Sequence, residues 1–129
     1  MPKNKRSALM SKVRGKNTGI EKLFLEELKR RNISGFKRYG KVVGKPDFIF
    51  YRNKTVVFCD GDFWHGYRFN TWKDKLNKFW ENKIENNIKR DRKVRILLKN
   101  EGWQVIRFWG HEINENTRVC VDKLINLMG

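Results

Sequence analysis

The stretch PDFIFYRNKTVVFC, residues 46–59, decides the fold of this chain. Its two halves are rich in aromatic and β-branched residues, and the polar residues 52–54 between them are typical of a turn. The segment therefore predicts a β-hairpin. Pro46 suits the first position of a strand, where the missing backbone N–H does not weaken the sheet.

Helices and further strands are predicted on both sides of this hairpin. An amphipathic helix over residues 18–32 begins with Thr18-x-x-Glu21, the pattern of a capping box. The remaining predicted elements are a short strand within 36–43, a long helix over 79–100, a strand over 103–109 and a helix over 117–128. This order predicts one α/β domain with a mixed sheet over residues 18–129, preceded by a basic arm over residues 1–17.

The chain carries a large excess of positive charge. Lysine and arginine contribute 30 of its 129 residues and aspartate and glutamate 14, which gives a formal net charge of +16 at pH 7. Such a charge favours binding to a phosphate backbone. Because 39% of the residues are hydrophobic, the chain can bury a core and is not a disordered basic tail. Charge alone does not separate a nuclease from a binding or ribosomal scaffold protein.

The sequence predicts neither a membrane span nor a secretory signal. No apolar run approaches the roughly 18–20 residues that a bilayer span needs, and the first 17 residues lack an apolar segment. The two cysteines provide no disulfide framework. We therefore expect a soluble protein of a reducing compartment, the cytoplasm.

Several carboxylates lie at strand ends. Asp47 begins one predicted strand, and Asp60 and Asp62 follow the next, so antiparallel pairing would bring Asp47 beside residues 59–62. Carboxylate and carbonyl oxygens in such an arrangement suit Mg²⁺, which can activate water and neutralise a phosphoryl oxygen. The alternative is that these are unrelated turn aspartates.

Four other polar residues also have two interpretations. Asn87 and Asp91 lie on the apolar side of the long helix, where they either join the helix to another element or face a polar site. Glu21 either completes the capping box or reaches the strand ends. His65, next to two aromatic residues, is either a packed side chain or a general acid or base beside a metal.

Aromatic and basic residues are interleaved between the hairpin and the long helix. Aromatic rings can stack on bases or wedge between them, while lysine and arginine bind phosphates. The alternative is that most of these rings belong to the core. Phe63 and Trp64 are the best wedge candidates because they follow Gly61 in an irregular segment.

The chain resembles the very-short-patch repair (Vsr) endonucleases over nearly its whole length. The matching motifs stand in register: Arg6-Ser7 with Met10 and Arg14, Asn17-Thr18-x-x-Glu21, Pro46-Asp47-Phe48, Gly61-x-Phe63-Trp64-His65, Phe79-Trp80-x-x-Lys83-Ile84-x-x-Asn87 with Arg90-Asp91, and Gly102-Trp103-x-Val105 with Trp109. The resemblance implies a restriction-endonuclease-like fold of the PD-(D/E)xK type, although the lysine of that motif is missing. It also implies Mg²⁺-dependent nicking of duplex DNA 5′ to the thymine of a T:G mismatch, the product of 5-methylcytosine deamination.

The resemblance also implies roles for individual residues. By position, Asp47 would bind Mg²⁺ together with the backbone carbonyl of Cys59, and His65 would be the acid or base near the attacking water. The residues expected to hold metal-bound waters are Glu21, Asp60, Asn87 and Asp91, although better-known members often carry histidine in place of Asp60. The expected DNA-binding residues are Met10, Arg14, Phe63, Trp64 and Trp80, to which the interleaving of basic and aromatic residues adds Arg68.

Better-known relatives carry a structural zinc that this chain is not expected to bind. The positions of its ligands are taken here by Asp62, Tyr67, Phe69 and His111. Because Cys59 and Cys120 are the only cysteines, a thiolate-rich site cannot be built. We expect Asp62 and His111 to form a charge-assisted hydrogen bond in place of the zinc.

Three functions remain open at this point. The first is a mismatch nickase acting on double-stranded DNA as a monomer, with mismatch-repair proteins as candidate partners. The second is a site-specific restriction or nicking endonuclease of the same fold without mismatch preference. The third is a DNA-binding module that has lost catalysis, against which the presence of Asp47, His65, Asn87 and Asp91 argues.

Overall fold

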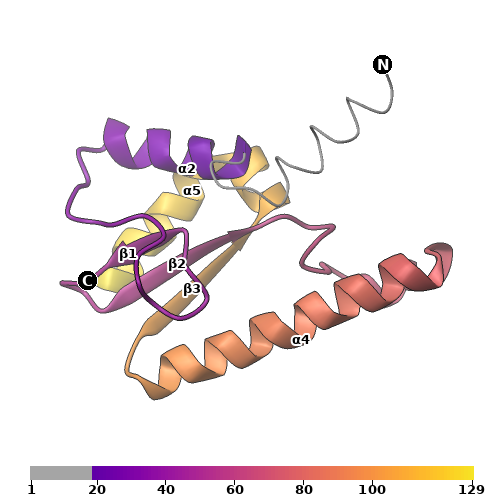
Figure 1. Ribbon diagram of the computed structural model, residues 1–129. Coiled ribbons are helices and arrows are strands. Elements are labelled where there is room, and N and C mark those ends of the chain that lie inside the picture. The colour runs from indigo at the N-terminus through magenta and orange to yellow at the C-terminus, as the bar shows by residue number, and fades with distance from the viewer. Residues whose placement is uncertain (1–18) are drawn as a thin grey trace.

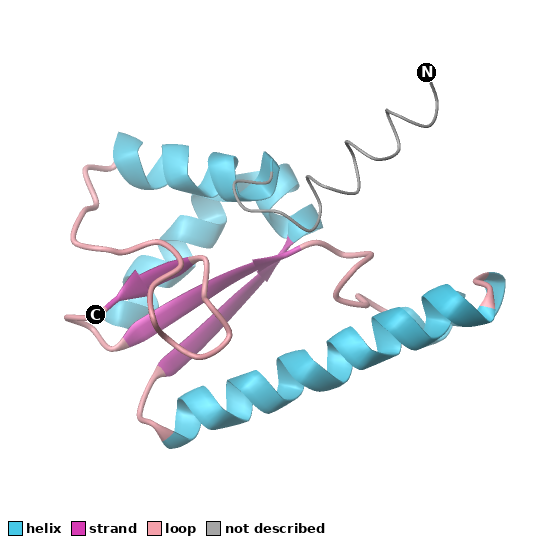
Figure 2. Cartoon of the chain, viewed as in Figure 1, coloured by secondary structure: helices cyan, strands magenta, loops and turns pink. Residues whose placement is uncertain are grey.

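A three-stranded sheet between helices forms the centre of the computed structural model, which describes residues 19–129 (Figure 1). In chain order the elements are α2 (Gly19–Arg30), β1 (Phe48–Phe50), β2 (Thr55–Asp60), α3 (Phe69–Trp72), the 3₁₀ helix η1 (Lys73–Lys75), α4 (Lys78–Asn100), β3 (Gln104–Trp109) and α5 (Gly110–Met128). Helices α2 and α5 lie on one face of the sheet, and α4 runs along the other (Figure 2). The predicted α/β class with a mixed sheet is confirmed.

The sheet has the order β1-β2-β3. Strand β1 pairs antiparallel with β2, with Phe48 opposite Val57, which confirms the predicted hairpin. Strand β3 pairs parallel to β2 over six residue pairs. A parallel pair needs a long crossover connection, and α4 supplies it. Because β2 and β3 run in the same direction, both end at the same edge of the sheet, with Asp60 opposite Trp109.

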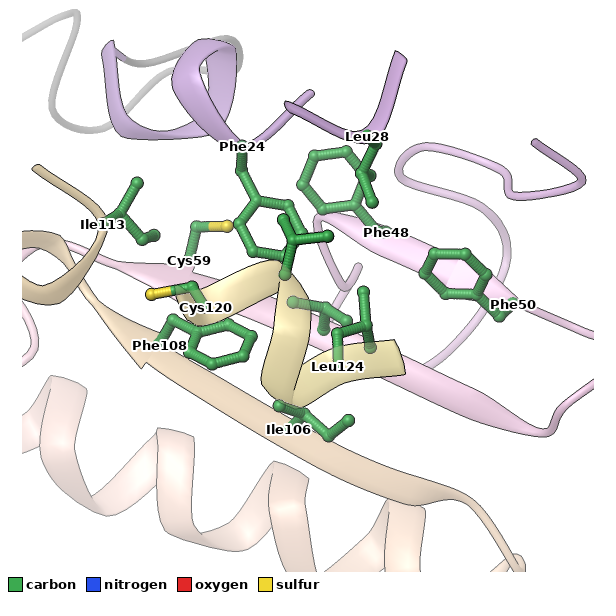
Figure 3. Packing of buried hydrophobic residues seen from close by; sticks show 12 residues of the cluster. Phe24, Leu28, Phe48, Phe50, Cys59, Ile106, Phe108, Ile113, Cys120 and Leu124 are labelled. Carbon is green, nitrogen blue, oxygen red and sulfur yellow. The ribbon is translucent and has the colours of Figure 1, made fainter. Parts of the chain in front are cut away.

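Residues of the strands alternate between two hydrophobic clusters. On the side of α2 and α5, Val57, Cys59, Ile106 and Phe108 pack with apolar residues of both helices (Figure 3). On the side of α4, the cluster contains Ile49, Val56, Leu98 and Trp103. This alternation is the period of two expected of a sheet covered on both faces. It directs Asp60, at the end of β2, toward the side of α4.

Phe24 is central to the larger cluster and provides a test of the fold. Its side chain is fully buried, with its ring centroid 5.2 Å from that of Phe48 and 5.5 Å from that of Phe108. We expect Phe24→Ala to lower the free energy of unfolding by about 3–5 kcal/mol, since it removes buried surface and leaves a cavity. Urea denaturation measures this change. Leu23→Ala on the exposed side of the same helix is the matched control, and an equal loss there would contradict the assignment of the core.

Two predicted elements differ from those observed. The strand predicted within 36–43 is wrong, because only Lys37 forms an isolated bridge, to Ile49, and Tyr39 has a φ of 54°, which extended strands exclude. The last helix begins at Gly110 rather than at residue 117. Its backbone breaks at Asn116, where φ is −159°, so the predicted helix corresponds to the part after this kink.

The basic arm over residues 1–17 lies outside the described residues, as do Met10, Arg14 and Thr18. The roles assigned to them, and the division of the chain into arm and domain, remain predictions. None of the helices within residues 19–129 is long and apolar enough to cross a bilayer.

Candidate active site

The predicted site residues gather where β1 begins and where β2 and β3 end. Asp47 precedes β1, and its Oδ2 accepts a hydrogen bond from the backbone N–H of Cys59 at 2.6 Å. This bond takes the place of a sheet hydrogen bond just before the start of β1. Because the N–H and C=O of one strand residue point to the same side, the Cys59 carbonyl is directed toward Asp47 as well. The two expected metal ligands are therefore neighbours.

Asp47 shares its surroundings with the carboxylate of Glu21 from α2. Burial raises the pKa of Asp47 to about 8, and the nearby negative charges of Glu21 and, more weakly, Asp60 act in the same direction; the hydrogen bond from Cys59 lowers it. Glu21 is buried, with 3% of its surface exposed. Glu21 is therefore not a solvent-exposed residue of the helix terminus, and its carboxylate lies close to that of Asp47.

Two residues of the segment before β1 hold the carboxylate of Glu21 beside the start of that strand. Arg38 donates from Nη2 to Oε1 of Glu21 at 3.0 Å and from Nε to the backbone carbonyl of Asp47 at 2.9 Å. The hydroxyl of Tyr39 bonds to the same oxygen of Glu21 and accepts from Arg38. One guanidinium thus joins α2 to the start of β1.

A second group of side chains lies at the end of β2, on the side of α4. Asp60, His65 and Asp91 each offer an atom within 4.8 Å of the others. Nδ1 of His65 is 2.6 Å from Oδ2 of Asp91, and its Nε2 is 3.6 Å from Oδ1 of Asp60. Burial lowers the pKa of His65, but the bond to Asp91 and the charge of Asp60 outweigh it, so the pKa is raised. On the carboxylate of Asp60 burial has the opposite effect and raises the pKa.

A tight turn between β2 and α3 places His65 in this group. The backbone N–H of His65 bonds to the carbonyl of Gly61, and that of Tyr67 bonds to the carbonyl of Asp62. Gly66 has a φ of +75°, and a β-carbon there would lie 2.3 Å from Cδ1 of Ile88. Glycine therefore allows the turn to pack directly on α4.

Asn87 and Asp91, on successive turns of α4, have different roles. Asn87 donates from Nδ2 to the carbonyl of Trp64 at 3.1 Å and accepts from Arg90 at 3.1 Å. It therefore joins α4 to the turn that carries His65. Asp91 faces His65 and Asp60. Of the two roles considered for this pair, Asn87 joins the helix to another element, and Asp91 faces a polar site.

The aromatic residues expected to contact DNA divide into exposed and buried rings. Phe63 is 44% exposed and stacks on Trp72, with the rings inclined by 16°. Trp64 is only 6% exposed and packs against Trp80, itself half-buried. Trp64 is thus not a surface wedge in this conformation, because its ring fills the space between the turn and α4. Phe79, which belongs to a matching motif but was not among the expected DNA-binding residues, is 65% exposed.

The expected pair of Asp62 and His111 is present. Nδ1 of His111 is 2.8 Å from Oδ2 of Asp62, and the backbone N–H of His111 bonds to Oδ1 of the same carboxylate at 3.2 Å. The ring of Tyr67 lies 4.5 Å from that of His111. These contacts join the turn after β2 to the start of α5. That they take the place of a structural zinc remains a prediction.

A family model described as DNA mismatch endonuclease Vsr matches residues 1–71 of the chain. The chain belongs to the Vsr family. This membership places it among DNA endonucleases rather than among non-catalytic DNA-binding modules.

Individual Vsr relatives support the same assignment. The type II nicking enzyme V.HpaIIP of Haemophilus parainfluenzae is 35% identical over 118 residues, which cover 89% of this chain and 84% of that enzyme. DNA mismatch endonuclease Vsr of Escherichia coli is 30% identical over 81% of this chain and 68% of its own length. The type II nicking enzyme V.NmeDIP of Neisseria meningitidis is 45% identical over 68% of this chain, and this match spans 62% of that relative.

Three charged or polar residues of this Vsr-family site were missed by sequence reasoning. Arg38 and Tyr39 lie in a segment that was predicted as a strand, where nothing marked them as site residues. Arg107 donates from Nε to Oδ2 of Asp60 at 2.6 Å. The signal for Arg107 was available, because it is the one charged residue of β3 and stands between the apolar residues Ile106 and Phe108.

Proposed function

We propose that this protein is a Mg²⁺-dependent endonuclease that nicks one strand of duplex DNA 5′ to the thymine of a T:G mismatch. The observation that carries the proposal is the meeting of Asp47, Glu21 and the Asp91–His65 pair at one edge of the sheet in a chain of net charge +16. Family membership supports nuclease chemistry on DNA. The mixed sheet between helices supports a restriction-endonuclease-like fold of the PD-(D/E)xK type.

The residues around Asp47 fit a magnesium ion. The carboxylate of Asp47 and the carbonyl of Cys59 are hard oxygen donors, and the carboxylate of Glu21 lies beside them. Burial and the nearby charge of Glu21 raise the pKa of Asp47, and a divalent cation would stabilise the ionised form of both carboxylates. When bound, Mg²⁺ would neutralise charge on the phosphate and activate water.

His65 is suited to move a proton near the scissile phosphate. Its Nδ1 is held by Asp91 at 2.6 Å, so the ring is fixed and Nε2 remains to exchange a proton with the attacking water. Asp60 lies 3.6 Å from Nε2. Asp91 thus orients the imidazole, as a carboxylate does for a catalytic histidine in other hydrolases.

Exposed aromatic rings next to this site support recognition of a mismatch. The N-terminal part of α4 projects beyond the ends of the strands in Figure 1, and Phe79 and Trp80 belong to the first turn of this helix. Phe63 is exposed on the neighbouring turn, and Lys83 lies among the aromatic rings of Trp64, Phe79 and Trp80. A mismatched pair is easier to unstack than a paired one, so insertion of a ring favours it.

We expect Phe63→Ala to reduce the preference for a mismatched over a fully paired duplex by roughly 5- to 150-fold. The reason is the loss of stacking worth about 1–3 kcal/mol per base. The ratio of kcat/KM values on the two duplexes measures the effect. Val119→Ala, an exposed apolar residue of α5 on the far side of the sheet, is the control. Equal ratios for the two variants would exclude Phe63 as a wedge.

A panel of duplexes that carry each mismatch in varied flanks, with and without Mg²⁺, tests the proposed specificity. Preferred nicking of T:G duplexes supports the proposal. A second candidate, site-specific nicking without mismatch preference, is suggested by the relatives described as type II nicking enzymes. Equal cleavage of paired and mismatched duplexes of one sequence would establish it instead. A cytoplasmic location, a monomeric state and mismatch-repair partners remain part of the proposal.

A further inference from the structure

Arg107 is a charged side chain on a largely apolar part of the sheet. In β3, Ile106 and Phe108 point into the cluster under α2 and α5, so Arg107 points to the side of α4. Its side chain is only 19% exposed. A guanidinium in such a place is stable only if it is paired, because burial of an isolated charge is costly.

The partners of Arg107 are two carboxylates and an indole. Its Nε donates to Oδ2 of Asp60 at 2.6 Å, its Nη2 lies 3.5 Å from Oδ2 of Asp91, and its guanidinium carbon lies 4.0 Å from the ring centroid of Trp109. The register explains the first contact: Arg107 lies opposite Phe58, and Asp60 is the next residue of β2 on the same side. Contacts from three sides fix the planar group in one orientation.

The carboxylates that Arg107 contacts belong to a group with the chemistry of a metal site. Asp60, His65 and Asp91 offer two carboxylate oxygens and an imidazole nitrogen within 4.8 Å of one another. Such a set suits Zn²⁺ and other first-row divalent ions. Here, however, Oδ2 of Asp60 and Oδ2 of Asp91 already contact the guanidinium. A metal ion would have to displace this fixed positive charge or bind beside it.

We propose that Arg107 is a positioning residue that acts as the resident cation of the Asp60–His65–Asp91 group. It holds both carboxylates in place and prevents the group from binding a divalent metal ion. Through Asp91 it also fixes the orientation of His65. The consequence for nicking rests on the proposed function, whereas the consequence for metal binding does not.

Metal titration of the DNA-free, chelator-washed protein tests the proposal. We compare the wild type with Arg107→Met, which keeps the length and apolar contact of the side chain, and Arg107→Lys, which keeps its charge. Cobalt(II), followed by absorption and by native mass spectrometry, is the probe. We expect Arg107→Met to bind one more equivalent than the wild type, Arg107→Lys to bind no more, and a further Asp91→Asn change to remove the extra equivalent. Equal stoichiometry in the wild type and Arg107→Met would overturn the proposal.

The wild type alone gives a second test, which decides the matter if Arg107→Met does not fold. Imidazole ¹⁵N spectra of the wild type with one equivalent of Zn²⁺ should keep the His65 signals at their metal-free positions. A coordination shift at His65 would overturn the proposal.

Nicking kinetics test the positioning role separately. We expect Arg107→Met to lower kcat on a T:G duplex by more than 10-fold with KM within about threefold, and Arg107→Lys to recover part of the loss. An unchanged kcat would exclude a positioning role. If the wild type fails to nick T:G duplexes, the proposed function fails, while the cobalt stoichiometry still decides the role of Arg107.

Discussion

Replacement of Asp47 by asparagine should abolish nicking while DNA binding persists. Asp47 is the carboxylate that accepts from Cys59 beside the buried Glu21, and it is the main proposed ligand of Mg²⁺. Metal catalysis contributes several kcal/mol to the transition state, and each 1.36 kcal/mol is a factor of ten. We therefore expect kcat to fall by about 1,000-fold or more, measured under single-turnover conditions.

The controls for Asp47→Asn separate loss of chemistry from loss of structure. Because asparagine removes one of two facing carboxylates, the Tm of the variant should not fall below that of the wild type. Glu26→Gln removes one exposed carboxylate of α2 and should leave kcat unchanged. Affinity for a T:G duplex in the absence of Mg²⁺ should stay within a few-fold. Activity within tenfold of the wild type would show that Asp47 is not a required metal ligand.

Replacement of His65 by alanine should lower kcat by about 100- to 10,000-fold, the range typical of a general acid or base. The loss follows from the fixed position of the imidazole, with Nδ1 held by Asp91 and Nε2 turned to the site. KM for the duplex should change little, since the ring is not expected to bind DNA in the ground state. Quenched time courses of nicking at saturating enzyme measure the fall in the rate of the chemical step.

His111 provides the matched control for His65. It is the other histidine of the chain, it also contacts an aspartate, and it lies outside the group formed by Asp60, His65 and Asp91. His111→Ala should therefore leave kcat within a few-fold of the wild type. A loss as large as that of His65→Ala would mean that both substitutions act through the shared turn after β2 rather than through proton transfer.

Local sequence patterns predicted the fold wherever they agreed with the packing. The hairpin of residues 46–59 and the long helix α4 follow directly from residue types and apolar periodicity. The strand predicted within 36–43 failed because Gly40 and Tyr39 impose turns that no apolar pattern reveals. The start of α5 at Gly110 was missed because the kink at Asn116 interrupts its periodicity.

The composition of the site was more predictable than its internal pairing. The order of strand ends suggested that Asp47 and Asp60 would meet, and the lost zinc ligands suggested the Asp62–His111 pair. Sequence could not assign Arg107 to Asp60, since that pairing depends on the register of β2 and β3. Nor could it show that Trp64 is buried, because an aromatic residue in a turn suits either the core or the surface.

Mapping the cut on a doubly labelled T:G duplex tests the central claim most directly. The two strands carry different fluorophores, and the duplex is compared with its C:G counterpart, each in the presence of Mg²⁺ or a chelator. The account predicts one Mg²⁺-dependent nick, 5′ to the mismatched thymine, with the other strand intact and the C:G duplex uncut. Cleavage of both strands, equal cleavage of the C:G duplex, or cleavage that persists in the chelator would contradict it.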